Sequence, residues 1–513
     1  MDSVKHAAVT LFCLAAFLGS VFLYSRNNNF SSFSHPDEAL KAAQIVEKKR
    51  LYLHPQLTFE ATEVALKFSR SRPTATLEWD HQVILAGRWM SALFAGLTVV
   101  ALSLVGYRYA GFAGLMTAAF SVGLCPSLLL YAHYMKEDTA LVCGIALTLL
   151  AALIYSAASS GRRGIIALLF LGVAAGVAAS GKYIGLIALI AALAFVASTR
   201  PWRALAWRWG IIIVAFGVTA ALINYRIFVE WSRFQEGLRY ETNHVLIQHF
   251  GGTVMNWPNL FAAKGLFRET MPQILMLAGV FLISLAVFWK RTSRWDLFLV
   301  LFGGFFAIIL SFSIIPEYRY NLPIIIMLHL MAALAVVRLA AVVIAPLNWI
   351  VVVLALALMI PFQLQRCLNY LNQFANDSRV RLRVFVAHNV PPDSVVLADA
   401  YAMQLYDDDP QLAENERKLP VSLQATFWVA DFGEFESLSS LGVNYVAVSE
   451  RAYGRFFDPD VHAAPGDWHY SARRRFYEKL FAEGELVWSS NPDPPTYSFV
   501  NPALRLYRIS EHR

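Results

Sequence analysis

The stretch Ser34-His35-Pro36-Asp37-Glu38 follows the first apolar run of the chain, which begins near residue 7. It places two adjacent carboxylates in a polar loop just beyond a segment long enough to cross a membrane. Charged side chains beside a bilayer are costly to desolvate, so this pair predicts a functional site. A structural explanation is also open, because Ser34 and Asp37 fit a capping box and Pro36 suits a first helical turn.

The composition is that of a membrane protein. Of the 513 residues, 57% are hydrophobic and only 15% are charged, and the mean hydropathy is +0.48. These values exclude an ordinary water-soluble globule and predict a protein embedded in the lipid bilayer. The net charge of +7 does not indicate a nucleic-acid partner, because most arginines fall between apolar runs. The four cysteines have no C-x-x-C spacing, which predicts neither a disulfide framework nor a zinc site.

Apolar runs of membrane-spanning length predict a multi-pass α-helical protein with about eleven transmembrane helices. They begin near residues 7, 83, 112, 137, 164, 183, 210, 271, 296, 322 and 346. Basic residues such as Arg108, Arg162 and Arg338 fall in every second connection, and this positive-inside bias places those connections in the cytoplasm. We therefore predict a bacterial inner (plasma) membrane protein with a cytoplasmic N-terminus, a retained signal-anchor and an extracytoplasmic C-terminus.

The remaining connections fall on the outer side and carry the polar motifs. The first outer loop, residues 25–82, also contains His54-Pro55-Gln56-Leu57 and an apolar stripe from Leu57 to Phe68 at helical spacing, which predicts an interfacial helix. The later outer connections hold Tyr131 to Asp138, Gly181-Lys182-Tyr183, an aromatic loop from Tyr225 to Glu269, and Pro316 to Pro323. Because all five lie on one side, we expect them to converge.

The chain becomes polar after Pro361. We predict a transmembrane domain over residues 1–362 and a small extracytoplasmic α/β domain over residues 363–513. Its candidate strands are Val395 to Asp399, Tyr445 to Val448 and Leu504 to Arg508.

Two sets of residues bear on metal binding. Asp407-Asp408-Asp409 contains an Asp-x-Asp pattern, but its turn-like polar surroundings favour a solvated loop. His35 and His54, together with the loop acids, could bind a divalent cation. We predict that no metal or other cofactor is required.

Convergence of the outer loops would gather acids, cations and imidazoles in one place. The residues are Asp37, Glu38, Glu137 and Asp138; Arg88, Lys182 and Arg319; and His35, His54 and His133. A carboxylate can remove a proton from an acceptor hydroxyl, while arginine and lysine stabilise a departing phosphate. This combination predicts group transfer from a phosphate-linked lipid whose tail stays in the bilayer.

The motifs, taken in order, resemble the landmarks of GT-C membrane glycosyltransferases. The nearest branch contains the protein O-mannosyltransferases and the lipid A aminoarabinose transferase. The motifs are His-Pro-Asp-Glu at 35–38, His-Pro-Gln-Leu at 54–57, Gly87 to Leu93, Lys136-Glu137-Asp138, Ala179 to Tyr183, Glu317 to Pro323 and Asn501 to Tyr507. The likeness runs through most of the chain. The C-terminal domain has no Trp-Trp-Asp motif, which argues against an oligosaccharyltransferase.

The resemblance implies an inverting transferase that moves a sugar, a hexose or a pentose, from a polyprenyl-phosphate carrier to an acceptor hydroxyl. The acceptor would be a glycolipid, an envelope polysaccharide or a protein at the outer face. Asp37 is implied as the general base with Glu38 supporting it. Glu137 and Asp138 match a second acid that orients the acceptor or the first-loop helix. The implied contacts to the donor phosphate are Arg88, Lys182, Arg319, Tyr320 and His54, the last standing where relatives carry a lysine or other polar group.

Structural explanations compete with these roles. Glu137 and Asp138 could cap a helix, Arg88 could form a structural ion pair, and Lys182, Arg319 and Tyr320 could be interfacial anchors. Another class of protein, a transporter or lipid flippase, usually carries ionisable residues near the bilayer midplane. Here the spans are nearly free of charge and the polar groups gather at one face, which favours an interfacial enzyme. A structural or assembly factor would leave the clustered loop acids unexplained.

Overall fold

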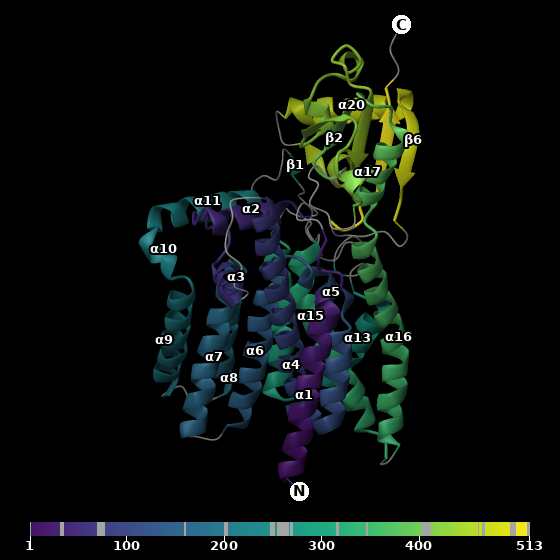
Figure 1. Cartoon of the computed structure of the whole chain (residues 1–513). Coiled ribbons are helices and arrows are strands. Elements are labelled where there is room, and N and C mark those ends of the chain that lie inside the picture. The colour runs from purple at the N-terminus through teal and green to yellow at the C-terminus, as the bar shows by residue number, and fades with distance from the viewer. Residues whose placement is uncertain are drawn as a thin grey trace.

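The computed structural model is a bundle of long helices with a small sheet domain at one end (Figure 1). The N-terminus lies at the other end of the bundle, and helices α2 (Pro36–Val46) and α11 (Trp231–Leu246) lie at the end that carries the sheet. The structure describes residues 2–30, 35–68, 77–158, 161–199, 204–246, 252–253, 266, 270–313, 318–344, 347–402, 412–459, 461–463, 467–492 and 499–509.

All the apolar runs predicted from the sequence fall in helices of this bundle. These are α1 (Asp2–Ser25), α4 (Leu77–Gly123), α6 (Asp138–Ala157), α7 (Arg162–Gly181), α8 (Leu186–Thr199), α9 (Leu205–Ile223), α13 (Pro272–Val287), α14 (Arg294–Leu310), α15 (Leu322–Ala340) and α16 (Asn348–Ala375). Within the described residues, seven stretches are long and apolar enough to cross a membrane. The multi-pass helical class is confirmed. The number of crossings stays a prediction, because α8, α13 and α14 have only 14, 16 and 17 residues.

Helix α4 accounts for two of the predicted runs because it folds back on itself. Its backbone leaves the helical region at Ala110 and Gly111, and Gly111 adopts a φ of 63° that favours glycine. On either side of this turn, Gly106 and Gly114 touch so closely that a Cβ on Gly106 would lie 2.1 Å from the carbonyl oxygen of Gly114. The two glycines therefore let the arms of a helical hairpin pack backbone against backbone.

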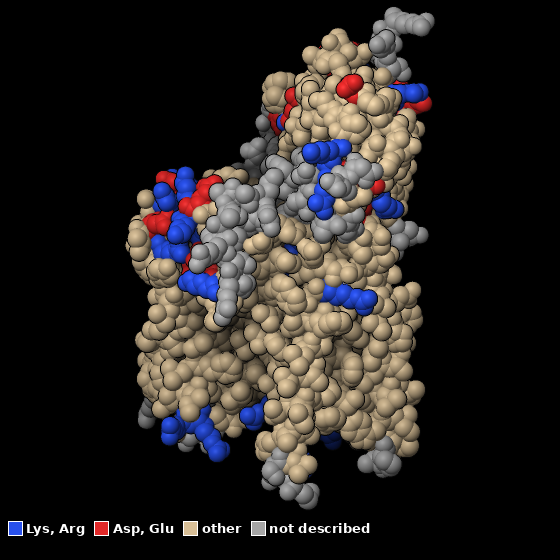
Figure 2. All heavy atoms as spheres, viewed as in Figure 1, with Lys and Arg blue, Asp and Glu red and all other residues tan. Residues whose placement is uncertain are grey.

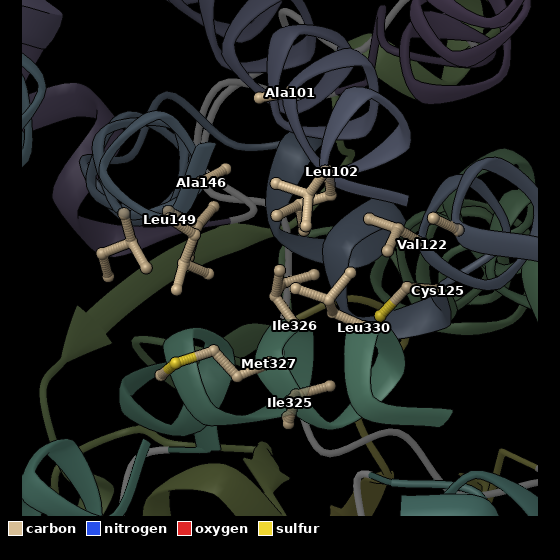
Figure 3. Packing of buried hydrophobic residues seen from close by; sticks show 14 of the residues in the cluster. Ala101, Leu102, Val122, Cys125, Ala146, Leu149, Ile325, Ile326, Met327 and Leu330 are labelled. Carbon is tan, nitrogen blue, oxygen red and sulfur yellow. The ribbon is translucent and has the colours of Figure 1, made fainter. Parts of the chain in front are cut away.

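The core of the bundle is built from α4, α6 and α15. Leu102 and Val122 from the two arms of α4 meet Leu149 of α6 and Ile326 and Leu330 of α15 (Figure 3). Small residues are common in this cluster, as expected where apolar helices associate by close packing rather than by exclusion of water.

The outer surface of the bundle suits lipid. On the face shown in Figure 2, charged side chains gather at the two ends, and the surface between them is almost entirely uncharged. Large apolar side chains of the outlying helix α9 are exposed there, including Val214 and Leu222. The chain is an integral membrane protein. Which end faces the cytoplasm stays a prediction.

The first loop folds into two helices at the sheet-domain end. These are α2 and α3 (Leu57–Phe68). Helix α3 buries Thr58, Phe59, Thr62 and Leu66, while Val64 and Phe68 of the predicted apolar stripe stay exposed. Leu57, Ala61 and Ala65 of the stripe are half-buried, so the stripe is exposed only in part, and the interfacial position of α3 stays a prediction.

The C-terminal sheet has five strands in the order β3-β2-β4-β7-β6. They are β2 (Val395–Asp399), β3 (Ser422–Thr426), β4 (Tyr445–Ser449), β6 (Glu485–Ser490) and β7 (Leu504–Arg508). Strand β2 runs parallel to β3 and β4, and β7 runs antiparallel to β4 and β6. The helices around it are α17 (Ser378–Asn389), α18 (Glu414–Arg417), α19 (Glu450–Tyr453) and α20 (Trp468–Glu483). The three predicted strands and the small α/β domain are confirmed.

Helix α16 leads directly into the sheet domain, and a short strand pair is one of the contacts that join this domain to the rest of the chain. Asp377 lies between α16 and α17, where its carboxylate pairs with Arg379 and accepts the backbone N–H of Asn501 at 2.7 Å. The short strand β1 (Gly252–Thr253), which follows α11, pairs with β5 (His462–Ala463). Helix α16 continues through residue 363 to Ala375, so the predicted domain boundary falls inside a helix. That division of the chain stays a prediction.

Candidate active site

Helix α2 positions the two acids of the first loop. Its N-cap is His35, whose Nδ1 accepts the backbone N–H of Asp37 at 3.2 Å, and Pro36 occupies the first turn. The sequence suggested a capping box that begins at Ser34, whereas the N-cap of α2 is His35. Ser34 itself lies outside the described residues. Burial, Lys136 and Arg319 lower the pKa of His35 well below its usual value against the opposing effect of Asp37, so the ring is neutral at pH 7.

Glu38 forms a buried clamp with Arg88 of α4. The Nε and Nη2 groups of Arg88 donate to the two carboxylate oxygens of Glu38 at 2.9 and 2.7 Å, and both residues are fully buried. Arg88 also donates to the carbonyl oxygen of Phe30 at 2.7 Å, and Glu38 accepts the backbone N–H of Met135 at 2.7 Å. This geometry ties three segments together, as a bidentate ion pair does when every donor finds an acceptor.

Asp37 points the other way, into a group of cations. Its carboxylate pairs with Lys136 and lies 3.9 Å from Nη2 of Arg319. The Asp37 side chain is 37% exposed, whereas that of Arg319 is 14% exposed. Burial opposes ionisation, but Lys136 and Arg319 outweigh it and hold the pKa of Asp37 well below its usual value. A charged and accessible carboxylate results.

Glu137, the residue before α6, holds α2 in place. It is fully buried, and its carboxylate lies 2.5 Å from Nζ of Lys41 on α2 and 4.0 Å from Nε2 of His54. Burial lowers the pKa of Lys41 to about 8 and that of His54 to about 3, against the raising effect of Glu137. Burial works against ionisation of Glu137, but the two lysines Lys41 and Lys136 keep its pKa below the usual value.

A third group joins two further elements. Asp138, the first residue of α6, accepts a hydrogen bond from Nζ of Lys182 at 2.7 Å. That ammonium lies 4.3 Å from the ring centroid of Tyr320, and the guanidinium of Arg319 lies 5.5 Å from the same ring. Lys182 thus connects the start of α6 to the segment that precedes α15.

Helix α11 covers one side of this region. Its Phe234 packs edge-on against Tyr52 and Tyr183, and a Cβ on Gly237 would lie 2.2 Å from the carbonyl oxygen of Leu51. One turn further, burial raises the pKa of Glu241, while Lys182 and Lys136 act to lower it. These interactions place the inner face of α11 beside the cluster.

The structure brings together most residues proposed from the sequence. Asp37, Glu137, Asp138, Lys182, Arg319, Tyr320, His35 and His54 form a single connected region, called the Asp37 cluster from here on. Arg88 and Glu38 belong to the clamp behind it. His133 is fixed elsewhere, between the carbonyl oxygens of Leu129 and Arg26 and against the ring of Phe374. The roles of these residues stay predictions.

Two further cations contact the Asp37 cluster and were not assigned roles from the sequence: Lys41, which pairs with Glu137, and Lys136, which pairs with Asp37. Lys41 follows Asp37 by four residues in α2, and that helical spacing places both on one face. Lys136 stands beside Glu137 in a motif already noted. Among the described residues, no three His, Cys, Asp or Glu side chains form a group that could hold a metal ion. Asp407 to Asp409 lie outside the described residues, and metal dependence stays a prediction.

Solved structures of two membrane transferases resemble this fold. The crystal structure of ArnT from Cupriavidus metallidurans bound to undecaprenyl phosphate matches with a TM-score of 0.52, covering 98% of each chain at 16% identity. The archaeal oligosaccharyltransferase AglB from Archaeoglobus fulgidus, in complex with an inhibitory peptide and a dolichol-phosphate, matches with a TM-score of 0.51 at 12% identity. That match covers 95% of this chain and 80% of AglB. No protein-family model and no curated protein sequence matches the chain. The chain has the GT-C fold, as the motifs predicted.

Proposed function

We propose that this chain is a membrane glycosyltransferase that moves a sugar from a polyprenyl-phosphate-linked donor to an acceptor hydroxyl at the outer membrane face. The observation that carries the proposal is the position of Asp37. Its carboxylate is charged and partly exposed, and it stands beside Arg319 at the end of a GT-C bundle. The two similar structures contain undecaprenyl phosphate and a dolichol-phosphate, which supports a lipid phosphate as the donor class.

The reaction would proceed by one inverting displacement. The carboxylate of Asp37 takes the proton of the acceptor hydroxyl, whose oxygen forms a bond to the anomeric carbon of the sugar. The bond between that carbon and the phosphate oxygen breaks with its electron pair on the phosphate. Arg319 and Lys182, both 14% exposed at their side chains, stabilise the released phosphate.

The supporting residues have different parts in this proposal. Glu38 and Arg88 fix the first turn of α2 from behind, so a direct phosphate contact by Arg88 would require it to leave Glu38. Glu137 orients the first-loop helix through Lys41, which is one of the two roles that the GT-C resemblance implies for the second acid. His54 is neutral at pH 7 and lies beside Glu137, where it can only donate or accept a hydrogen bond.

The competing proposal is a lipid or sugar flippase without transfer chemistry. Carriers keep ionisable groups near the bilayer midplane, whereas the Asp37 cluster lies at the helix ends next to the sheet domain. A transferase therefore fits the placement better.

A reconstituted assay tests the proposal. Purified protein in vesicles is given polyprenyl-phosphate sugars, and transfer is followed with wild type, Asp37→Asn and a matched control, Glu47→Gln. Glu47 is the exposed C-cap residue of α2, away from the cluster. We expect transfer by wild type and Glu47→Gln and none by Asp37→Asn. Full activity of Asp37→Asn would reject Asp37 as the base, and translocation of the lipid without transfer would favour the flippase.

A further inference from the structure

The imidazole of His35 has one ring nitrogen whose role the capping bond does not explain. Its Nδ1 accepts the backbone N–H of Asp37 at 3.2 Å. A neutral imidazole carries one proton, so that proton is on Nε2, which is therefore a donor. Nε2 lies 3.3 Å from Nη1 of Arg319. A guanidinium only donates, so neither group can accept a hydrogen bond from the other.

The orientation of this ring is fixed by its neighbours. The ring centroid of His35 lies 4.3 Å from that of Phe499, next to the C-terminal sheet, and 4.9 Å from that of Tyr134. The residue is only 2% exposed. The two aromatic contacts fix the plane of the ring, and the cap of α2 fixes which nitrogen faces Asp37, because turning the ring over by 180° would break that cap. The sheet domain thus helps to keep the Nε2–H group of His35 directed at Arg319.

Two adjacent donors are suited to one shared acceptor. We propose that Nε2–H of His35 and the guanidinium of Arg319 together bind a single anionic oxygen, and that this oxygen belongs to the phosphate of the lipid-linked donor. The inference rests on the proposed function and adds a phosphate contact from the first outer loop. His35 also precedes the first turn of α2, and the positive end of that helix dipole favours an anion at the same place.

Two substitutions separate this role from capping. His35→Asn keeps an acceptor near the position of Nδ1, and asparagine is among the best N-cap residues, but the Nε2–H donor is lost. His35→Gln places its amide N–H₂ near the position of Nε2 but loses the short-range cap. If His35 binds the phosphate, the Asn variant is the damaged one. If His35 only caps α2, the Gln variant is the damaged one.

Binding of polyprenyl monophosphate to purified full-length protein in nanodiscs is the measurement. We expect His35→Asn to weaken binding by about tenfold or more, as loss of a charge-assisted hydrogen bond does, and His35→Gln to stay within about threefold of wild type. Polyprenol, which has no phosphate, should bind all three proteins equally. Thermal unfolding confirms that the variants are folded.

The outcomes that overturn the inference are distinct. Equal binding of the lipid phosphate by wild type and His35→Asn would remove His35 from the phosphate site, and so would a folded His35→Gln variant that has lost binding. An equal loss for polyprenol would show that the phosphate is not what His35 recognises. Failure of the wild type to bind polyprenyl monophosphate would instead overturn the donor class of the proposed function.

Discussion

Helix α15 has an acid–cation group at each of its ends, and the two groups are built differently. At the end away from the sheet domain, Asp296 is buried and accepts hydrogen bonds from Tyr109 and Ser293, each at 2.8 Å, while Arg338 lies 3.5 Å away and also donates to Tyr109. At the other end, Asp37 is 37% exposed, and Arg319 approaches it only to 3.9 Å.

This difference indicates a structural role for the group around Asp296 and a chemical role for the Asp37 cluster. The group around Asp296 joins α4, α14 and α15, and its carboxylate also completes the capping box of α14. Its acid is enclosed by short bonds, as a structural clamp requires. The Asp37 cluster gathers several buried cations around an acid that solvent can reach, and such charges are costly to keep unless a ligand uses them. We therefore expect substitutions at the two ends to affect different properties.

The largest expected effect comes from exchanging the two acids for amides. Asp37→Asn should reduce sugar transfer by on the order of 10²–10⁴-fold, the usual contribution of a general base, with a smaller loss of thermal stability because Lys136 loses its ion pair. Asp296→Asn should lower the unfolding temperature and leave transfer by the folded fraction near that of wild type. Transfer assays and thermal unfolding on both variants measure this. If both variants lost only stability, the proposed difference between the ends would be wrong.

The buried pair of Glu38 and Arg88 should behave like the group around Asp296, so that its loss affects mainly stability. Arg88→Met leaves the carboxylate of Glu38 buried without its partner, and breaking such a pair costs about 3–5 kcal/mol. We expect a strong fall in the yield of folded protein, measured by size-exclusion chromatography and thermal unfolding. The double variant Arg88→Met with Glu38→Leu removes both charges and should recover part of the loss. No recovery would mean that Arg88 has a role beyond its pair with Glu38.

Much of this comparison could be predicted from the sequence. Apolar runs predict the helices, the alternation of basic connections predicts that the polar motifs share one end of the bundle, and the order of the motifs predicts the fold. Strands β2 and β4 can be predicted because they are rich in apolar and β-branched residues, and β7 because apolar residues alternate with arginine. These features depend on local composition, which a sequence displays directly.

The pairing of the charges could not be predicted in the same way. Asp37 and Glu38 are adjacent, but successive residues of a helix point about 100° apart, so one meets Arg88 and the other Lys136. Which acid takes which cation depends on how α2 lies across α4 and on residues 97 or more positions away. The separate runs near residues 83 and 112 predicted the fold-back within α4, but not the close approach of Gly106 and Gly114, which is a property of packing.

A smaller effect is expected for a substitution in the group around Asp296. Tyr109→Phe removes one hydrogen bond to Asp296 and one from Arg338 while keeping the ring beside Trp295. We expect a loss of stability of about 1–3 kcal/mol and unchanged sugar transfer. The matched change at the site end is Tyr320→Phe, which keeps the ring under Lys182 and Arg319. A larger effect of Tyr109→Phe on transfer than on stability would contradict a purely structural role.

The smallest expected effect concerns pH. Burial and Lys136 lower the pKa of Lys41 to about 8, against the raising effect of Glu137, so Lys41 loses its proton above pH 8 and ceases to hold Glu137. Transfer should therefore decline above pH 8. The contribution of Lys41 to the free energy of unfolding should rise over the same range. Between pH 8 and the ordinary lysine pKa of 10.5 the unfolded chain binds more protons than the native one, so raising the pH favours the native state. Lys41→Arg keeps its charge throughout this range.

The Lys41→Arg variant should therefore lose only about two- to threefold in transfer at pH 7, from the altered geometry of the pair with Glu137. The pH above which its transfer rate declines should be higher than in wild type. On the acidic side, the rate should stay constant down to pH 5, because the lowered pKa of Asp37 keeps that carboxylate charged. Transfer rates measured between pH 5 and 10 for wild type and this variant test this prediction. A decline that stays near pH 8 in the variant would assign it to another group and remove Lys41 from the control of Glu137, because arginine does not titrate there.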